Sequence, residues 1–289
     1  MQRLLYLLIY PIMWFTSILP LWLLYFMSSV LFVLVYYVIG YRKKVVKSNL
    51  RLVFPEKSES EIKEISKKFY QHLCDMIFET IKNLTFSEKE AMKRFTFENL
   101  DLVEDLYRQG KSILLMCGHY SSWEWSGILN NQNPYLGFAV YKKMDNPHFD
   151  RLVRKIRERF GASIVTNTKI VSTLFRLHRK GEKTMTLILA DQTPKLGAFK
   201  HRDTFMGIDV PVFTGTEELA KKLDFAALYL KITKVKRGYY SARFVPLAIE
   251  PKELEDYQIT RLFLSEIEKQ IKEKPEYYLW SHKRWKHRN

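Results

Sequence analysis

The sequence predicts an α/β fold in which a mostly parallel central sheet is flanked by helices and preceded by a helical membrane-anchoring segment. Two observations support this prediction. After residue 60, short apolar runs alternate with longer amphipathic stretches, a pattern typical of parallel strands joined by helices. The first forty residues are almost entirely apolar, with no charged side chain from Leu4 to Tyr41. We therefore divide the chain into an anchoring segment, residues 1–41, and one α/β domain, residues 42–289.

The apolar segment is longer than the roughly 20 residues of helix that cross a bilayer core. Pro11 and Pro20 interrupt it, so two arrangements fit: a single span within Leu21–Ile39 after an interfacial segment, or a helical hairpin broken near Pro20. The basic residues that follow are Arg42, Lys43, Lys44, Lys47 and Arg51. Because basic residues stay on the cytoplasmic side, we expect the rest of the chain to be cytoplasmic and to lie against the inner leaflet.

Capping boxes mark the first two helix starts after this segment, at Ser58 with Glu61 and at Ser87 with Glu90. A short helix from Leu100 to Gly110 then leads into the apolar run Ser112–Cys117, which has the length of a buried strand. A helical stretch through Trp123 and Trp125 follows, and after it the second predicted strand, Leu136–Tyr141.

Asn146 and Pro147 are typical of a helix start, and Gly161 of a helix end, so we predict a helix that runs to Phe160. The same reasoning gives the remaining elements. They are strand Ala162–Thr166, helix Thr168–Lys180, strand Thr184–Ala190, helix Thr214–Leu223, a hairpin of Ala226–Lys236 and Tyr239–Pro246, and helix Tyr257–Lys274.

Composition narrows the function. The 289 residues include 47 Lys and Arg against 31 Asp and Glu, a formal net charge of +16. Such an excess predicts an anionic partner: nucleic acid, an acidic membrane surface or a phosphorylated substrate. Two cysteines, Cys74 and Cys117, exclude a disulfide scaffold and form no paired motif for zinc or redox chemistry. The tail Trp280–Arg288 mixes Trp with basic residues, and beside a membrane segment this favours interfacial anchoring over nucleic-acid binding.

The strongest catalytic candidate is His119, which follows the first buried strand. Ligands of open α/β sheets bind beyond the carboxyl ends of strands, and a neutral imidazole there can take a proton from an attacking hydroxyl. Glu124, five residues on, is a candidate to orient the ring. Because residues five apart on a regular helix point about 140° apart, the pair can meet only if His119 lies just outside the helix. About one such pair is expected by chance among 7 His and 31 acidic residues, so the position after the strand carries the prediction.

Other candidates are weaker. Arg154 and Arg157 lie on a basic helix that is suited to a phosphorylated headgroup, or to a solvated surface. We expect Asp191 to fix Gln192 and the loop that follows it. Cys117 could form an acyl-thiol, but a buried strand cysteine is usually inert packing.

Several ordered motifs across the chain resemble those of the bacterial lipid A biosynthesis acyltransferases, the lauroyl and myristoyl group of the lysophospholipid acyltransferase superfamily. One of them is His, four residues, then an acid, within Gly-His-Tyr-Ser-Ser-Trp-Glu, and the ordered set is far more specific than this pair alone. The matching segments are Asn49–Pro55, Gly118–Glu124, Tyr141–Pro147, Arg157–Gly161, Asp191-Gln192, Phe205–Gly207, Thr214 and Pro275–Lys286.

The resemblance implies a membrane-bound O-acyltransferase with a glycerol-phosphate acyltransferase-like fold, its catalytic domain on the cytoplasmic face of the inner membrane. It would move a fatty acyl group from acyl carrier protein, or from coenzyme A, to a hydroxyl of a lipid A precursor, with no metal or redox cofactor. By this resemblance His119 is the general base and Glu124 its partner. The substrate-binding residues it indicates are Trp123, Tyr141, Lys142, Arg154, Arg157, Asp191 and Gln192.

Departures from the family pattern leave the acceptor open. Gly118 stands where the motif has Asn, and Lys142 replaces an Arg. The alternatives are a lysophospholipid, an aminolipid or a glycolipid acceptor. An alternative of another class is a catalytically silent, membrane-tethered protein that binds anionic ligands, for which His119 and Glu124 would be dispensable.

Overall fold

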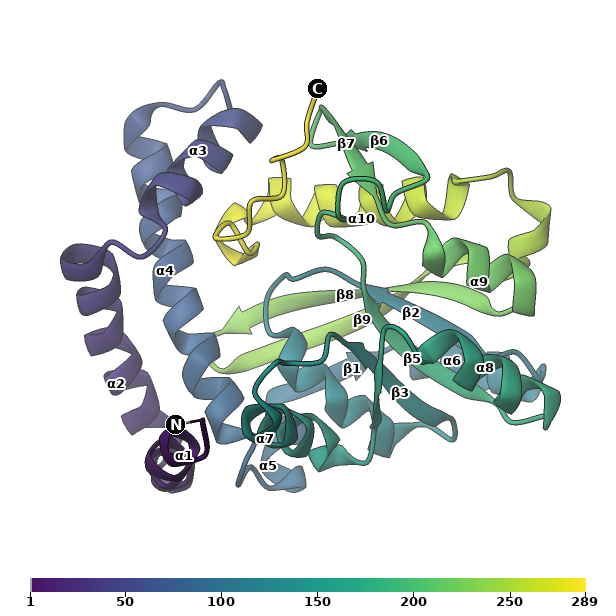
Figure 1. Cartoon of the computed structure of the whole chain (residues 1–289), viewed down its shortest axis with the longest axis horizontal. Helices are drawn as coiled ribbons and strands as arrows, with labels where there is room; N and C mark the ends of the chain where they lie inside the picture. The colour runs from purple at the N-terminus through teal and green to yellow at the C-terminus, as the bar shows by residue number, and fades with distance from the viewer. Residues whose placement is uncertain (1) are drawn as a thin grey trace.

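A computed structural model describes residues 2–289 and contains the predicted sheet. Across these residues seven strands form one sheet in the order β1-β9-β8-β2-β5-β3-β4, and β6 and β7 form a separate antiparallel pair (Figure 1). The strands are β1 (Phe95–Glu98), β2 (Ile113–Cys117), β3 (Leu136–Tyr141), β4 (Ser163–Thr166), β5 (Thr184–Leu189), β6 (His201–Phe205), β7 (Ile208–Val212), β8 (Ala226–Lys236) and β9 (Tyr239–Ala248). Strands β8, β2, β5, β3 and β4 are parallel, and only β9 and its parallel neighbour β1 run against them, so the prediction of a mostly parallel sheet is confirmed.

Helices cover both faces of the sheet (Figure 1). The α-helices are α1 (Gln2–Ile18), α2 (Leu21–Val33), α3 (Lys43–Val53), α4 (Glu59–Lys82), α5 (Glu88–Arg94), α6 (Leu100–Arg108), α7 (Pro147–Arg157), α8 (Ile170–Arg179), α9 (Gly215–Leu223) and α10 (Gln258–Glu273). Shorter turns are the π-helix η1 (Leu34–Ile39) and the 3₁₀ helices η2 (Trp123–Gln132), η3 (Glu158–Phe160), η4 (Pro251–Glu253) and η5 (Pro275–Tyr277).

Strand β2 shows why the sheet needs cover on both sides, because all of its residues are buried. Leu114 and Met116 belong to one apolar core, which α8, α9 and α10 complete. Ile113, Leu115 and Cys117 belong to the other, which η2, α5 and α6 complete. Side chains of a strand point alternately to opposite faces, so a continuous apolar run is what a doubly covered strand requires.

Local signals fixed several boundaries. Ser58 caps α4 and accepts a bond from the Glu61 amide, while the Glu61 carboxylate accepts one from the Ser58 amide, which completes the capping box. Asn146 caps α7 through bonds from two following amides. The helix predicted to reach Phe160 ends at Arg157 and continues as η3, and the stretch after His119 is a 3₁₀ helix. Strands β1, β6 and β7 were not predicted.

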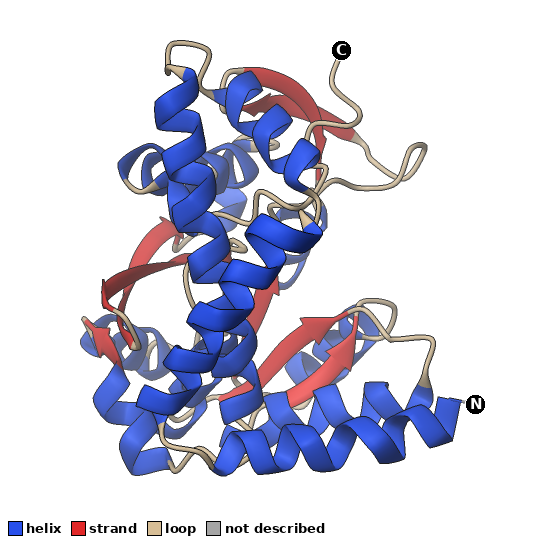
Figure 2. Cartoon of the chain, turned by 90° about the vertical axis from the view of Figure 1, so that its left-hand side faces the viewer, coloured by secondary structure: helices blue, strands red, loops and turns tan. Residues whose placement is uncertain are grey.

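The N-terminal helices are not a tight hairpin. Figure 1 views α1 end-on while α2 lies in the plane, and Figure 2 shows α1 crossing the foot of α4. Helix α2 runs along α4, and with η1 it forms the segment Leu21–Ile39, the one helix among residues 2–289 that is long and apolar enough to cross a membrane.

The carboxyl-terminal tail is part of the core, so the prediction that it anchors at the membrane interface is wrong. Trp280, Arg284 and Trp285 are all at most 1% exposed. The two indole rings stack with centroids 5.8 Å apart. The Asn49 amide donates to the Trp280 and His282 carbonyl oxygens at 2.9 and 2.8 Å, which ties the tail to α3.

Candidate active site

Sheet register brings His119 and Asp191 together. Strands β2 and β5 are parallel neighbours, and their last paired residues are Cys117 and Leu189. His119 and Asp191 each lie two residues beyond this pair, at the carboxyl ends of adjacent strands. The pairing of the strands therefore places the imidazole beside a carboxylate that is 72 residues away in sequence.

The two ring nitrogens of His119 have different partners. Nδ1 lies 2.7 Å from Asp191 Oδ1, and Nε2 lies 3.2 Å from the Gln192 side-chain nitrogen. Because a carboxylate only accepts and an amide nitrogen only donates, these contacts fit one tautomer, with the proton on Nδ1 and the lone pair on Nε2. The His119 side chain is 19% exposed and that of Asp191 is 1% exposed. In this tautomer Nε2 is the ring nitrogen that can accept a proton.

Asp191 is ionised despite its burial. Burial alone would raise the pKa of this carboxyl group, but the neighbouring His119 ring and hydrogen bonds hold the pKa below its usual range. Its second oxygen, Oδ2, is buried and has no hydrogen-bond partner within residues 2–289. A buried carboxylate beside an imidazole stabilises the imidazolium that forms when the ring takes a proton.

Gly118 lets strand β2 approach α10 closely at this point. A Cβ atom added there would lie 2.0 Å from Ile267 Cδ1 and 3.9 Å from the Asp191 carboxyl carbon. The departure from the family motif at this position therefore has a packing reason, because any larger residue would require the Ile267 side chain to move.

Glu124 does not bond to His119, so the predicted hydrogen-bonded pair is wrong as a contact. Glu124 Oε2 instead accepts from Arg157 Nε at 3.0 Å, and Oε1 from Arg157 Nη2, which makes the ion pair bidentate. His119 does lie outside the helix, as the pairing required, yet Asp191 occupies its Nδ1. Trp123 contacts both His119 and Glu124. Its ring packs edge-on to the imidazole with the ring centroids 5.1 Å apart, and its Nε1 donates to Glu124 Oε1 at 3.3 Å.

The carboxyl-terminal tail holds the loop between His119 and η2. The Ser121 amide donates to the Tyr277 carbonyl at 3.0 Å, and the Leu279 amide donates to the His119 carbonyl at 3.1 Å. Ser121 has a φ of +57°, a left-handed conformation that is uncommon for a residue with a Cβ. The tail thus fixes the backbone that presents the imidazole.

Cys117 and His282 lie close to the site but in unreactive forms. Burial raises the pKa of the Cys117 thiol, so the nucleophilic thiolate is disfavoured, in keeping with the interpretation of this residue as packing. Burial also lowers the pKa of His282 to about 4. His282 Nε2 accepts from the Thr193 amide at 3.4 Å, next to the Asp191-Gln192 loop.

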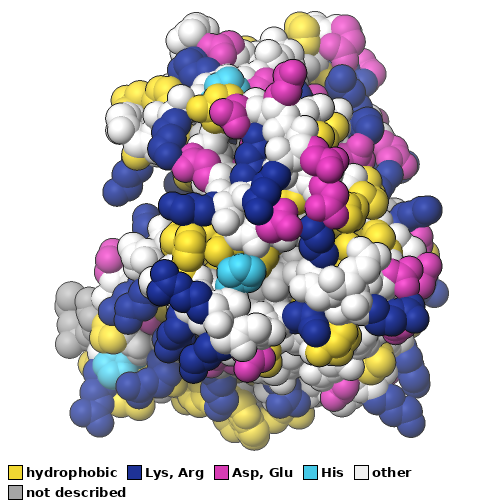
Figure 3. All heavy atoms as spheres, turned by 90° about the vertical axis from the view of Figure 1, so that its right-hand side faces the viewer, with side chains coloured by type: hydrophobic (Ala, Val, Ile, Leu, Met, Phe, Trp, Pro, Cys, Tyr) yellow, Lys and Arg dark blue, Asp and Glu magenta, His cyan; other side chains and the backbone are white. Residues whose placement is uncertain are grey.

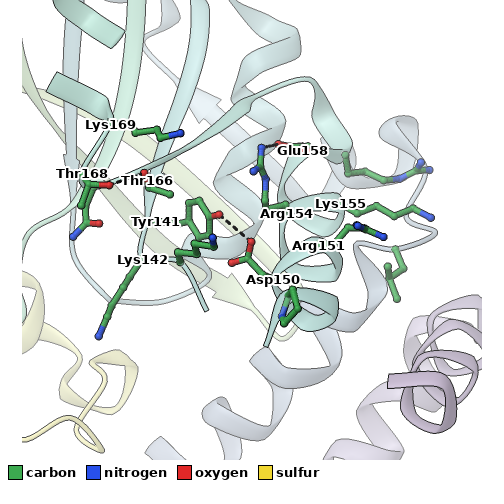
Figure 4. Close-up of a pocket in the computed structure, with 15 residues that line it drawn as sticks. Tyr141, Lys142, Asp150, Arg151, Arg154, Lys155, Glu158, Thr166, Thr168 and Lys169 are labelled. Carbon is green, nitrogen blue, oxygen red and sulfur yellow. Dashed lines mark hydrogen bonds and ion pairs between the residues drawn. The ribbon is translucent and has the colours of Figure 1, made fainter. Parts of the chain in front are cut away.

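A basic pocket of about 1230 Å³ opens farther along the same sheet edge, where β3 and β4 end. Figure 4 shows side chains converging on it from α7 and from the loops after the two strands. The basic residues that line it are Lys142, Lys143, Arg151, Arg154, Lys155, Arg159 and Lys169.

Both acidic side chains of this pocket bond to neighbouring side chains of the protein. Asp150 accepts from the Tyr141 hydroxyl at 3.2 Å, and Glu158 pairs with Arg154 at 3.3 Å. Six of the basic side chains form no ion pair with any described residue, namely Lys142, Lys143, Arg151, Lys155, Arg159 and Lys169, although Arg159 donates to the Phe86 carbonyl. Lys and Arg side chains gather at the lower left of the face shown in Figure 3. A pocket with this surplus of cations attracts phosphate groups.

The predicted site residues therefore separate into two groups. His119, Asp191 and Gln192 lie in contact at the carboxyl ends of β2 and β5, while Tyr141, Lys142 and Arg154 line the basic pocket. Arg157, predicted to face a headgroup, is instead bound to Glu124 between the two groups. The sequence offered one signal for the pairing of His119 with Asp191, since both follow predicted buried strands, but it did not show that these strands are adjacent.

Comparisons with known proteins agree with the motifs. The sequence model of the bacterial lipid A biosynthesis acyltransferase family matches residues 1–287. The lipid A biosynthesis lauroyltransferase of Escherichia coli K12 is 27% identical over 252 residues, which cover 86% of this chain and 80% of that protein. The lipid A biosynthesis palmitoleoyltransferase of the same organism is 24% identical over 250 residues, 86% and 79% of the two chains. A lipid A biosynthesis acyltransferase of Haemophilus influenzae is 25% identical over 239 residues, 81% and 72% of the two chains.

Proposed function

Because this chain belongs to the bacterial lipid A biosynthesis acyltransferase family, we propose that it transfers a fatty acyl group to a hydroxyl of a lipid A precursor, with His119 as the general base. The observation that carries the role of His119 is the contact at 2.7 Å between its Nδ1 and Asp191 Oδ1, which leaves the Nε2 lone pair directed away from the carboxylate. Membership of the family makes the chain an acyltransferase, so the silent binding protein is disfavoured.

The proposed reaction begins when the acceptor hydroxyl displaces the Gln192 amide from His119 Nε2. The imidazole takes the hydroxyl proton while the oxygen attacks the thioester carbonyl of the acyl donor. The tetrahedral intermediate then collapses, the carbon–sulfur bond breaks, and the thiolate receives the proton from the imidazolium. An ester and a free thiol are the products, and His119 returns to its starting state.

Asp191, rather than Glu124, is the proposed partner of the base. Its carboxylate would hold the proton on Nδ1 and stabilise the imidazolium between the two proton transfers. Glu124 keeps a role in this proposal, as the residue that anchors Arg157 and Trp123 beside the ring. Its two hydrogen bonds to Arg157 give a fixed geometry that a single charge contact would not.

The basic pocket is the proposed site for the phosphate groups of the acceptor. Arg151 and Lys155 on α7 and Lys142 and Lys169 on the strand loops surround it with unpaired cations. The donor is proposed to be acyl carrier protein, because an acidic carrier suits a chain of net charge +16. Acyl coenzyme A supplies the same thioester chemistry and is the alternative donor. The proposal requires no metal or redox cofactor.

The inner membrane is the proposed location, with the α/β domain on the cytoplasmic side. Support comes from the apolar helices α1 and α2 and from the basic residues that follow them at 42–51. A lipid acceptor and a soluble acyl donor meet at this surface.

The test is acyl transfer by isolated membranes supplied with a phosphorylated lipid A precursor and either acyl carrier protein or coenzyme A thioesters. His119→Ala is expected to lower the rate by about 10²–10⁴-fold at unchanged protein abundance. His201→Ala, which alters a histidine on β6, is the matched control and should keep the rate. Turnover near the wild-type level in His119→Ala would contradict the role of the base.

Lipid analysis of a deletion strain identifies the acceptor. Loss of one acyl chain from lipid A, restored by the wild-type gene and not by His119→Ala, supports the proposed acceptor. An unchanged lipid A with a missing acyl chain on a phospholipid, aminolipid or glycolipid would instead assign the enzyme to that acceptor.

A further inference from the structure

We propose that α1 and α2 lie in the interface of a single leaflet and hold the domain on the membrane without crossing it. The proposal rests on the membrane location given above but not on the chemistry of His119. It replaces both arrangements that the sequence allows, the single span and the hairpin.

Helix α2 has one protein-facing side and one exposed apolar side. Leu24 and Ser28 are completely buried, whereas Trp22 is 71% and Phe26 63% exposed. The buried positions recur every three or four residues, as they do for a helix lying lengthwise on a surface. The exposed large side chains of α2 and η1 are Trp22, Phe26, Val30, Val33, Leu34, Tyr37, Val38 and Ile39.

Helix α1 repeats this arrangement at an angle to α2. Leu8, Ile12 and Phe15 are each more than 60% exposed, while Ser17 is buried and bonded through its carbonyl to Lys82 of α4. Both helices thus carry exposed apolar side chains, and they lie at the left and lower left of the molecule in Figure 1. An amphipathic helix of this kind binds with its apolar side in the headgroup and acyl boundary.

Charged groups of the domain hold the middle of α2, which is incompatible with a spanning helix. Arg237 donates to the Tyr25 carbonyl at 2.9 Å and to Ser29 Oγ at 3.1 Å, and Asp75 accepts from Ser28 Oγ at 2.6 Å. The α2 residues in these bonds, Tyr25, Ser28 and Ser29, lie close to the centre of the 19-residue segment Leu21–Ile39. If the segment spanned a bilayer, Arg237 and Asp75 would lie near its midplane, where charged side chains are strongly disfavoured.

Cations border the apolar surface where headgroups would lie. Arg42, Lys43 and Lys44 follow η1 after two residues, and the Lys155 amine of α7 lies 5.9 Å from the Tyr10 ring centroid of α1. This arrangement fits an anionic leaflet rather than a second copy of a chain of net charge +16, because two such surfaces would repel.

The contact between α1 and α7 fixes the position of the basic pocket relative to the membrane surface. The Tyr6 ring stacks on His148 at 5.5 Å, and α7 lines the pocket. With α1 in the interface, the pocket opens at the level of the headgroups. A phosphorylated lipid can then enter it with its acyl chains still in the leaflet.

Thiol labelling of intact cells tests the topology. Both native cysteines, Cys74 and Cys117, are buried, so single introduced thiols dominate the signal. In spheroplasts treated with a membrane-impermeant maleimide, Arg3→Cys and Leu19→Cys should stay unlabelled from outside. Arg3→Cys should react after lysis, as should the domain control Lys67→Cys. Labelling of both variants from outside would establish a single span, and labelling of Leu19→Cys but not Arg3→Cys a hairpin; either result overturns the proposal.

Vesicle flotation tests the apolar surface. Phe26→Asp should weaken binding of the purified chain to vesicles of anionic and zwitterionic phospholipid by at least about tenfold. The reason is the loss of one aromatic side chain that the bilayer would bury. Val171→Asp, which alters an exposed apolar residue on α8, is the matched control and should bind as wild type does. Equal binding of the two variants, or a change of oligomeric state alone in Phe26→Asp, would overturn the proposal. Acyl transfer measured on the same variants keeps this result separate from the test of His119.

Discussion

Replacing Asp191 with Asn removes the charge beside His119 and leaves the side-chain shape nearly unchanged. The carboxylate is 1% exposed and its Oδ1 lies 2.7 Å from Nδ1, so solvent cannot substitute for it. An amide at this position cannot stabilise the imidazolium, and its nitrogen can turn toward Nδ1 and force the proton onto Nε2. The substitution should therefore remove most of the rate enhancement that the general base provides, which is about 10²–10⁴-fold. In barrier height this is about 3–5 kcal/mol.

The assay is the initial rate of acyl transfer by purified enzyme in detergent, at saturating donor and acceptor. Asp191→Asn should lower kcat by about 10²–10⁴-fold. Glu124→Gln is the comparison, because it keeps the shape of the acid in the family motif and touches Arg157 and Trp123 rather than the imidazole. We expect its loss of kcat to be at least about tenfold smaller. A rate for Asp191→Asn close to wild type, together with a collapse in Glu124→Gln, would refute the reasoning.

Three further predictions concern stability, each measured by thermal unfolding in detergent. Gly118→Ala should cost about 1–3 kcal/mol, because the new Cβ would lie 2.0 Å from Ile267 Cδ1, and an unchanged midpoint would contradict this packing. Glu79→Ala should cost at least about 2 kcal/mol, because three hydroxyl groups lose the buried carboxylate that accepts their bonds; a smaller loss would show that water replaces it. His282 has a pKa lowered to about 4 by burial, so below the unfolded value of about 6.5 only the unfolded chain takes up the proton, and stability falls as pH drops through this window. His282→Gln should flatten that slope, and an identical slope in both proteins would contradict it.

The sequence was informative wherever a signal is local. Ser58 and Asn146 marked helix starts because their side chains bond the free amides of a first turn. The apolar run Leu136–Tyr141 is β3 at its predicted bounds. Strand β1 alternates apolar and polar residues, but it was missed because it is only four residues long and follows helix α5 directly. The β6–β7 pair was missed because His201–Phe205 is polar, and its pairing comes from the partner strand.

The site was predicted only in part, because its residues are brought together by contacts between segments far apart in the sequence. His119 was found because it follows a buried strand, but its partner was assigned to the nearest acid in sequence, Glu124. The true neighbour, Asp191, follows a different strand, and only the pairing of β2 with β5 brings it near. The buried tail shows a similar effect, since Trp280 packs on Phe54 after α3 and on Trp285, and Trp285 packs on Phe205 of β6. Strand order and long-range packing are not encoded in any short window of residues.

The protonation of the His119 ring tests the central claim most directly. Nitrogen-15 NMR of histidine-labelled enzyme, with the His119→Ala spectrum subtracted, reports which ring nitrogen carries the proton when the ring is neutral. We predict the proton on Nδ1 in the wild-type enzyme and in Glu124→Gln, and loss of this preference in Asp191→Asn. A proton on Nε2 in the wild type, or a preference that survives in Asp191→Asn and disappears in Glu124→Gln, would contradict the account.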